Sequence, residues 1–522
     1  MEIKFIGAAR EVTGSKHLIT TRHGKKILLD CGMFQGKGLE TDSLNRNTMV
    51  DPAEIDHIIL THAHVDHSGL IPYFYKRGFR GSVICTQATR NLCSIMLPDS
   101  GFIQENDTLW FNKKRARQGL KPVDPIYTEK DAHACMELFI SVPLNRQFHI
   151  DNNIKVKFTN TGHLLGSASD TIEIDEFGEV TRIGYTGDIG RNNNYLLRAP
   201  DAFPQCDYLI VESTYGDRLH QDKQFSEDEL LRIIKHTCVE KKGKLIIPAF
   251  AIGRTQEIVY ILNNFYNEKK LPFIPVYVDS PLAVNATNIF RLHLDLFNKD
   301  VAEVLEHDDD PFGFGTLKYI TNVNHSKALN RREEPCIIIS ASGMMEAGRV
   351  KHHIANSIDN PKNSILAIGY CAPTTLGARI LRGEKEISIF GMPHTVNAEV
   401  FSIDAFSGHA DYKEMEEYLR CQNPAKVKKV FIVHGDYEAQ VPYSEVLKKA
   451  GFKNIVIPEA GEVFQLGVRS YIKKFRVLSS KFRVFMYLCS SKSDCRRQKQ
   501  FCVRKVGTAQ STVLLNRKVS SR

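Results

Sequence analysis

The stretch Thr61–His67, which reads THAHVDH, holds three histidines and an aspartate. It follows the apolar run IIL and precedes SGLIP, so it lies where a short strand gives way to a loop and a helix, a place where binding sites are often built. Side chains two residues apart in an extended strand end point the same way, so His62 and His64 can reach one metal ion. Asp66 and His67 lie at the start of the expected helix and can reach a second ion.

This H-x-H-x-D-H pattern resembles the signature of the metallo-β-lactamase fold. Zinc takes four ligands, so a dinuclear site of that kind needs a further histidine for each ion and a carboxylate between the ions. Later stretches offer these groups beside glycine: TGHLLGSA, YTGDIG and VFIVHGD. The resemblance implies two Zn²⁺ ions, one held by His62, His64 and His163, the other by Asp66, His67 and His434, with Asp188 bridging them.

A second set of motifs narrows the resemblance. Glu212 closes the apolar run Tyr208–Val211 and is followed by STYG, and a charge at the end of a buried strand needs a partner. The stretch Ala405–Asp411, AFSGHAD, comes later, followed by the His434 loop. In this order the motifs resemble those of the β-CASP nucleases of the cleavage-and-polyadenylation type, a metallo-β-lactamase subgroup that acts on nucleic acids. The resemblance covers residues 1 to about 466. It implies a catalytic set of His409, Glu212 and Asp66, in which His409 stabilises charge or protonates the leaving oxygen and Glu212 orients the His409 ring.

At 522 residues the chain is too long for one ordinary core, so more than one domain is expected. The resemblance implies a four-layer αββα metallo-β-lactamase domain in two parts, residues 1–209 and 396–466, around an inserted α/β β-CASP domain, residues 210–395. Alternating strand and helix patterns in the insertion predict a parallel sheet. From Gln87 to about Phe148 the pattern is helical and polar, and Trp110 in that region has no evident chemical role. Asp30, which ends an early strand, either supports the metal loop or is an ordinary turn carboxylate.

Strand ends in the insertion carry small or polar residues before expected helices. Helix N-termini beside arginine can hold phosphates, so these turns are the expected substrate contacts, although ordinary α/β turns look similar. The residues concerned are Arg254, Ser342, Gly343 and Arg379.

Composition predicts a cytoplasmic protein with no membrane segment. The hydrophobic content is 42% and the charged content 25%, and no apolar run approaches the ~20 residues of a membrane helix. The N-terminus enters a strand-like pattern with no signal peptide. The 12 cysteines include no C-x-x-C pair, which favours reduced thiols over disulfides or thiolate zinc sites.

The net charge of +9 is concentrated at the C-terminus. Residues 467–522 hold 15 basic residues and one acid, which leaves 54 basic and 59 acidic residues, a charge of −5, in the rest of the chain. This basic tail has no clear helical or strand period and is expected to lie outside the core fold. It fits a nucleic-acid-binding arm. It also fits a sequence read past a lost stop codon or in a shifted frame, and the contrast in composition between the tail and the rest of the chain favours this second interpretation.

The resemblance implies that the protein hydrolyses phosphodiester bonds of single-stranded RNA with a hydroxide activated by two zinc ions. A small-molecule hydrolase of the same fold would lack the insertion and the Glu212 and His409 motifs, and a non-catalytic RNA-processing scaffold would have lost metal ligands. DNA stays open as a substrate, and a homodimer as a further association. Ala405 stands where relatives resembling RNase J often have histidine, which favours an endonuclease, or a mixed activity, over a dedicated 5′-exonuclease.

Overall fold

The computed structural model describes residues 1–220, 223–369, 371, 374–403 and 406–467, together with three later strands. Ala405 and most of the tail lie outside the described residues. Contacts divide the chain into two units, Met1–Phe464 and Gln465–Arg522. In the second unit, β23 (Lys473–Ser479), β24 (Phe482–Leu488) and β25 (Val503–Lys505) pair as an antiparallel sheet. These strands form although the tail sequence shows no clear strand period, because antiparallel strands can form without a strict alternation of apolar residues.

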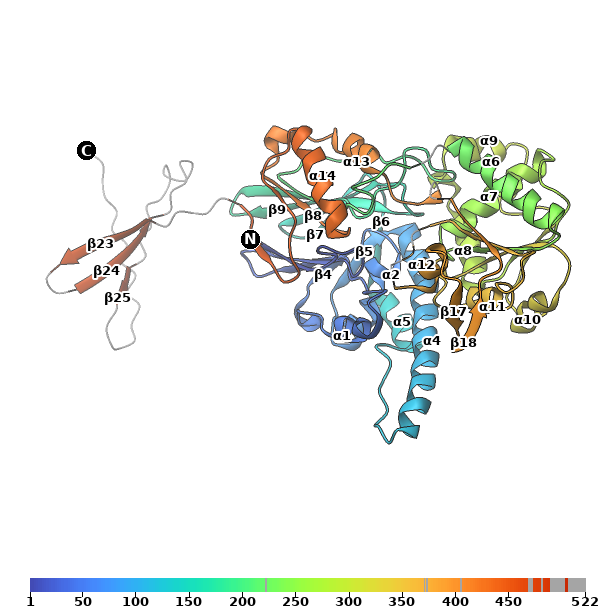
Figure 1. Ribbon diagram of the computed structural model, residues 1–522. Helices are drawn as coiled ribbons and strands as arrows, with labels where there is room; N and C mark the ends of the chain where they lie inside the picture. Colours follow the sequence, from blue (N-terminus) through green and yellow to red (C-terminus); the bar gives the residue numbers. More distant parts are fainter. Residues whose placement is uncertain are drawn as a thin grey trace. The chain divides into compact units, whose positions relative to one another are not determined.

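Two seven-stranded sheets form the middle of the first unit (Figure 1). The strands of the first sheet, in spatial order, are β22 (Val463–Gln465), β1 (Glu2–Gly7), β2 (Lys16–Thr20), β3 (Lys26–Leu29), β4 (His57–Ile59), β5 (Ser82–Thr86) and β6 (Phe139–Val142). Those of the second are β21 (Ile455–Val456), β20 (Lys429–Ile432), β11 (Tyr208–Val211), β10 (Glu179–Tyr185), β9 (Ala168–Glu176), β8 (Ile154–Asn160) and β7 (Gln147–Asp151). The sheets face each other: the Phe5 and Phe431 ring centroids are 4.9 Å apart.

Helices cover the outer face of each sheet. Those beside the first sheet are α1 (Thr41–Arg46), α2 (Val65–Ser68), α3 (Ile71–Lys76), α4 (Gln87–Arg117) and α5 (Glu129–Cys135). Those on the second are α13 (Tyr412–Leu419) and α14 (Tyr437–Lys449). Met415 of α13 and Leu447 of α14 pack in one buried cluster with Leu209 and Val430 of the sheet. This arrangement confirms the four-layer αββα fold that the motifs implied.

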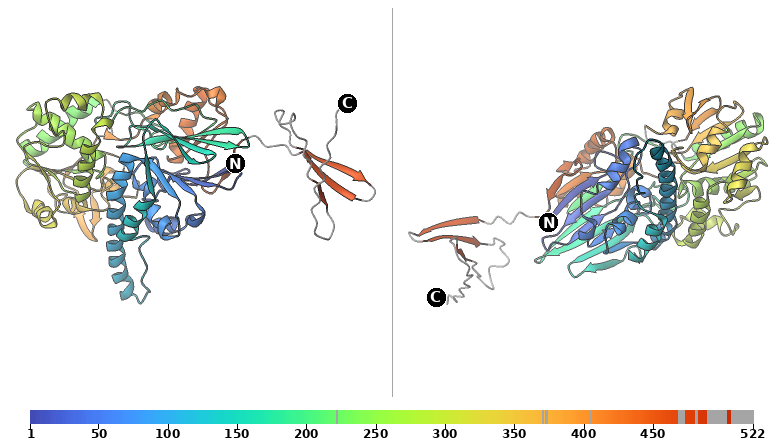
Figure 2. Two further views of the ribbon diagram at one scale, coloured as in Figure 1. Left: turned by 180° about the vertical axis from the view of Figure 1, so that it is seen from behind. Right: turned by 90° about the horizontal axis from the view of Figure 1, so that it is seen from below.

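The inserted domain is built on a six-stranded parallel sheet (Figure 2). Its strands, in spatial order, are β14 (Leu317–Tyr319), β13 (Val276–Val278), β15 (Cys336–Ser340), β12 (Lys244–Pro248), β16 (Ser364–Ala367) and β19 (Glu399–Ser402). The helices are α6 (Lys223–Ile234), α7 (Arg254–Asn267), α8 (Pro281–Leu292), α9 (Lys299–Val304), α10 (Val323–Arg331), α11 (Arg349–Ala355) and α12 (Leu376–Leu381), and β17 (Glu386–Ile389) and β18 (Met392–Thr395) form a hairpin. Because β19 pairs with β16, this sheet extends past residue 395, where the sequence suggested that the insertion ends.

One local difference from the sequence-based expectations has a physical reason. The region from Gln87 to Phe148 contains β6 and the start of β7 as well as helices, because pairing with β5 and β8 stabilises short strands that lack a strong pattern of their own. Helix α14 begins at Tyr437 and contains Pro442, a residue type that normally ends a helix. No helix among the described residues has the length and apolarity to span a membrane. The nine cysteines in the described segments are free thiols.

Candidate metal centre

The candidate ligands come from four segments of the chain at one edge of the two facing sheets. The β4 strand ends before His62 and His64, and α2 carries Asp66 and His67. The remaining three follow other strands of the second sheet: His163 lies between β8 and β9, Asp188 follows β10, and His434 follows β20. Sharp turns present them: Gly187 has φ 53° and His434 has φ 51°, the left-handed region in which glycine is favoured.

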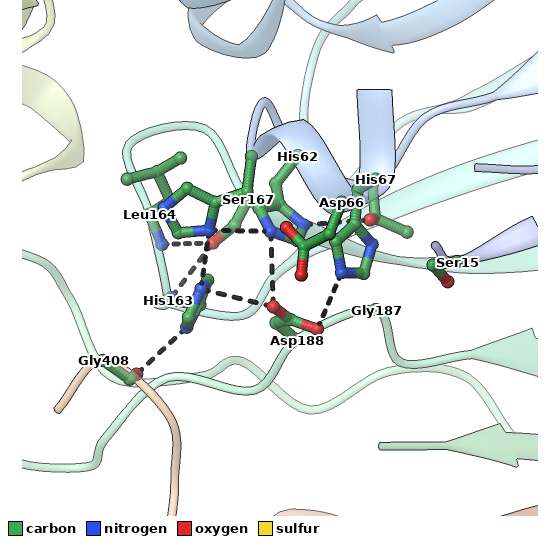
Figure 3. A network of polar contacts seen from close by, with 12 residues as sticks. Ser15, His62, Asp66, His67, His163, Leu164, Ser167, Gly187, Asp188 and Gly408 are labelled. Atoms are coloured by element: carbon green, nitrogen blue, oxygen red, sulfur yellow. Dashed lines mark hydrogen bonds and ion pairs between the residues drawn. The ribbon is translucent and has the colours of Figure 1, made fainter. Parts of the chain in front are cut away.

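Three imidazole nitrogens converge on one point. His64 Nδ1 lies 3.1 Å from His62 Nε2 and 3.2 Å from His163 Nε2. Asp188 Oδ2 completes the group, 3.3 Å from His62 Nε2 and 3.4 Å from His163 Nε2 (Figure 3). These four atoms therefore enclose a position equidistant from all of them.

A second group shares Asp188. The Nε2 atoms of His67 and His434 are 3.0 Å apart, and Asp188 Oδ1 lies 3.2 Å from His67 and 3.6 Å from His434. Asp66 Oδ2 is 3.5 Å from His434 Nε2. The two oxygens of one carboxylate thus face two separate clusters.

The distances fit a pair of tetrahedral ions. With zinc–nitrogen bonds of about 2.1 Å, neighbouring ligand atoms are about 3.4 Å apart, close to the separations in both groups. Asp188 Oδ1 is buried, and no hydrogen-bond donor reaches it from the described residues. An acceptor in that situation requires a cation or water. The residues therefore fit two metal ions bridged by Asp188.

The rest of the protein holds four of the five rings so that one nitrogen of each stays available. His67 Nδ1 lies 2.6 Å from Asp30 Oδ2, and Asp30 also accepts from Thr61 and from the Tyr185 hydroxyl at 2.8 Å. Asp30 therefore supports the metal loop and is more than a turn carboxylate. His163 Nδ1 is 3.1 Å from the Gly408 carbonyl oxygen. The corresponding partners of the other rings are Thr61 for His62 and Thr214 for His434.

Electrostatics favour the metal-binding protonation states of His62, His64 and Asp188, whereas the carboxylates of Asp188 and Asp30 outweigh burial and raise the pKa of His67 well above its usual value. Burial lowers the pKa of His62, and it lowers that of His64 to about 3 with help from His62, so both rings are neutral near pH 7. Burial would raise the pKa of Asp188, but His434, His67 and His62 outweigh it and hold the pKa well below its usual value. Neutral imidazoles around an ionised carboxylate are what a zinc site requires.

His409 lies beside this cluster with Glu212 behind it. His409 Nδ1 is 3.1 Å from Glu212 Oε1, and His409 Nε2 is 3.9 Å from Asp188 Oδ2. The His409 side chain is 18% exposed, whereas those of His62 and Glu212 are 0% and 1% exposed. Burial lowers the pKa of His409, but the Glu212 and Asp188 carboxylates outweigh it and raise the pKa. A ring oriented in this way can act on a molecule at the cluster surface, although Asp188, Glu212, His409 and His434 are also close enough to form a cation site.

The four residues expected at the substrate divide into two sets. Arg254 and Gly343 lie close together beside Phe250, and Ser342 lies next to Gly343 in the chain. Arg254 Nη1 donates to the Phe406 carbonyl at 2.7 Å, which ties the inserted domain to the loop before His409. Arg379 instead pairs with Glu384 at 2.8 Å. The structure thus brings Arg254 to the loop before His409, whereas the Arg379 side chain pairs with Glu384 within the inserted domain.

Sequence patterns missed several supporting residues. Tyr185 and Thr214 hold Asp30 and His434 through their hydroxyl groups. His220 Nε2 lies 2.9 Å from the His409 carbonyl oxygen. Tyr185 and Thr214 stand within quoted motifs, which was the available signal, whereas nothing in the sequence around His220 indicates this contact.

Three protein families match the chain in order. The Metallo-beta-lactamase superfamily matches residues 13–92, the Beta-Casp domain matches residues 255–380, and the Zn-dependent metallo-hydrolase RNA specificity domain matches residues 393–458. Ribonuclease TTHA0252 of Thermus thermophilus is 33% identical over 452 residues, 86% of this chain and 97% of that protein. An RNase J-like protein of Methanocaldococcus jannaschii is 33% identical over 467 residues, 89% of this chain and 99% of its own length. Cleavage and polyadenylation specificity factor 73 of Drosophila melanogaster is 31% identical over 444 residues, 84% of this chain and 60% of that protein.

Two facing sheets with a histidine and aspartate cluster at their edge define a metallo-hydrolase of the metallo-β-lactamase fold. With the inserted parallel sheet and the matches above, the chain belongs to the β-CASP family of metallo-β-lactamase nucleases. The family expected from the motifs is therefore confirmed, and the protein is a hydrolase.

Proposed function

We propose that the protein is a ribonuclease that hydrolyses phosphodiester bonds of single-stranded RNA with two zinc ions. The observation that carries the proposal is the shared carboxylate: Asp188 Oδ2 faces His62 and His163 while Asp188 Oδ1 faces His67 and His434. The names of the relatives, which include ribonucleases, support RNA as the substrate class. The proposal includes a cytoplasmic location, as the composition suggests.

The chain's own residues supply the rest of the chemistry. Bound divalent ions would lower the pKa of water to near neutrality and polarise the phosphate. His409 is partly exposed beside the cluster, so its Nε2 can donate a proton to the leaving oxygen, while Glu212 fixes the ring through Nδ1. The contacts of His67 Nδ1 with Asp30 and of His163 Nδ1 with the Gly408 carbonyl keep these two imidazoles from rotating. A non-catalytic scaffold, one of the rival functions, would not need this complete set of candidate metal ligands.

End-labelled single-stranded RNA and its DNA counterpart test the substrate, with metal analysis of the same protein. We expect close to two zinc ions per chain and cleavage of RNA, with Asp188→Asn lacking both metal and activity. The exposed variant Asp309→Asn is the matched control and should behave as the wild type. A stoichiometry that stays near one after zinc supplementation would contradict the dinuclear site, and cleavage of DNA alone would contradict the substrate.

A further inference from the structure

Helix α4 carries an uncovered face remote from the metal centre. The C-terminal half of α4 and the segment that returns from it stand away from the two sheets (Figures 1 and 2). The returning segment covers one side of this half: Asn112 exchanges two hydrogen bonds with Val123, and Arg115 Nε donates to the Lys121 carbonyl. The helix is therefore held in place on that side and open on the other.

Large apolar side chains gather on the open side. With 3.6 residues per turn, residues spaced by three, four and seven positions share a face. Phe102, Ile103, Leu109 and Trp110 occupy it and are 55%, 40%, 60% and 73% exposed. Four large apolar groups this exposed on one helix face indicate an interaction surface.

The end of the helix and the start of the returning segment are strongly basic, and Lys113, Lys114 and Arg117 of this stretch share the open face. No acid lies between Thr108 and Val123, while five cations do: Lys113, Lys114, Arg115, Arg117 and Lys121. None of the five forms an ion pair within the described part of the chain. Two of these cations lie against aromatic rings: Lys113 Nζ is 5.1 Å from the centroid of the Trp110 ring, and the Arg115 guanidinium is 5.6 Å from that of the Phe111 ring. This charge contrasts with residues 1–466, which carry a net charge of −5.

We propose that this face of α4, residues 102–117, is a second binding surface for single-stranded RNA, apart from the metal centre. The inference rests on the proposed function for its choice of ligand. Proteins hold single strands through cations that contact the backbone and aromatic rings on which bases stack, and both kinds of group are present on this face. A second copy of the chain fits less well, because two such basic segments repel each other when they lie together.

The position of α4 gives this surface a role in selecting long RNA. The helix begins beside the metal centre, since the Thr86 hydroxyl at its N-cap donates to the Gly166 carbonyl at 2.6 Å in the His163 loop. Trp110 lies 24 residues beyond Thr86, so the helix rise of about 1.5 Å per residue places it roughly 36 Å along the axis. Only an RNA that extends well past the metal centre can contact both places.

The chain supplies its own reporter, because Trp110 is its only tryptophan. Full-length, metal-loaded protein is mixed rapidly with oligouridine, and tryptophan emission is followed before cleavage proceeds. We expect saturable quenching by an oligomer of about 16 nucleotides, the upper end of single-strand site sizes, and little change with a tetranucleotide. RNA that binds in a gel-shift assay without changing the emission would overturn the proposal. A tryptophan emission that changes with protein concentration and not with RNA would also overturn the proposal. It would indicate that this face of α4 binds a second copy of the chain.

A charge-matched pair of variants tests the same surface. Lys113→Ala/Lys114→Ala/Arg117→Ala should weaken binding of the long oligomer at least tenfold and reduce the salt slope by about 2, at ~0.7 per lost phosphate contact. The control Lys426→Ala/Lys449→Ala/Lys453→Ala removes the same charge from exposed positions elsewhere and should bind as the wild type. Equal losses in both variants would show a general charge effect and overturn the site. RNA cleavage without any change in Trp110 emission would contradict the α4 binding surface and leave the proposed ribonuclease function intact. Quenching of Trp110 without RNA cleavage would support the binding surface and contradict the proposed function.

Discussion

His409 Nδ1 lies 3.1 Å from Glu212 Oε1, and the Glu212 carboxylate is in turn fixed by the backbone N–H groups of Ile189 at 2.6 Å and Thr214 at 3.1 Å. The buried acid that closes β11 therefore serves two purposes. It satisfies two backbone donors between strand ends, and it sets the orientation of a partly exposed histidine beside the metal cluster.

The first prediction separates His409 from His434. His434 is buried with its Nε2 among cluster atoms, so His434→Ala should lose metal and activity together. His409→Ala should keep both ions and lose about 10²–10⁴-fold in kcat, the usual scale for a positioned acid–base group. Elemental analysis and RNA cleavage measure both effects. Fewer ions in His409→Ala than in wild type would mean that the assignment is falsified and that His409 is a ligand.

The second prediction concerns Arg254 as a positioning residue. Its guanidinium donates to the Phe406 carbonyl, packs against Gly408 and pairs with the buried Glu257. Arg254→Ala should free the loop that carries His409 and lower kcat by about tenfold to a hundredfold, since small misplacements of catalytic groups cost that much. Arg254→Lys should restore part of it. A change confined to KM would instead indicate a direct RNA contact.

The third prediction tests the sequence-based role of Arg379. If Arg379 contacts phosphate, Arg379→Ala weakens RNA binding and flattens its salt dependence. If Arg379 instead only forms its partly exposed ion pair with Glu384, Arg379→Ala changes the free energy of unfolding by less than ~1 kcal/mol and leaves RNA binding unchanged. Titration of RNA at two salt concentrations, with Glu384→Gln as the control, decides between the two.

The fourth prediction links pH to the stability of the inserted domain. Burial opposes ionisation of Asp279, but hydrogen bonds from His353, Ser326 and Arg349 outweigh it and hold the pKa of Asp279 below its usual value. The stabilisation is therefore complete above the unfolded pKa of about 3.9 and is lost as pH falls through the lower folded value.

Asp279→Asn should accordingly destabilise the protein at pH 7 by about 3–5 kcal/mol, the cost of breaking a buried charge network. The difference from wild type should narrow as the pH falls below 4. Denaturant unfolding at several pH values measures this, with the exposed Asp309→Asn as control. A difference that stays constant with pH would contradict the linkage.

The fifth prediction concerns the C-terminal boundary. Truncation after Leu466 keeps β22, whose neighbour is β1 and whose Phe464 packs 5.0 Å from Phe431 between ring centroids. Stability and cleavage should match the full chain within about 1 kcal/mol. Truncation after Glu459 removes β22 and should lower the melting temperature. Loss of cleavage in the protein that ends at Leu466 would show that residues 467–522 are needed for activity.

The sequence alone determined the family, the fold class and the set of candidate ligands. These follow from dense local patterns: THAHVDH, the glycine-flanked His163, Asp188 and His434, and the acid after β11. Strongly periodic stretches such as Lys16–Thr20 and Tyr412–Leu419 likewise form the strand and the helix that their own patterns favour. Local patterns are sufficient there because backbone geometry and side-chain alternation act over a few residues.

Only the tertiary structure decided which atoms meet. The division of Asp188 between two clusters, the support of His67 by Asp30, and the contact of Arg254 with the Phe406 carbonyl join residues up to 367 positions apart. The uncovered face of α4 likewise depends on which side the returning segment covers. Such contacts arise from the packing of the sheets and helices against one another. The pattern within one stretch of sequence does not show which residues lie opposite it in the folded protein.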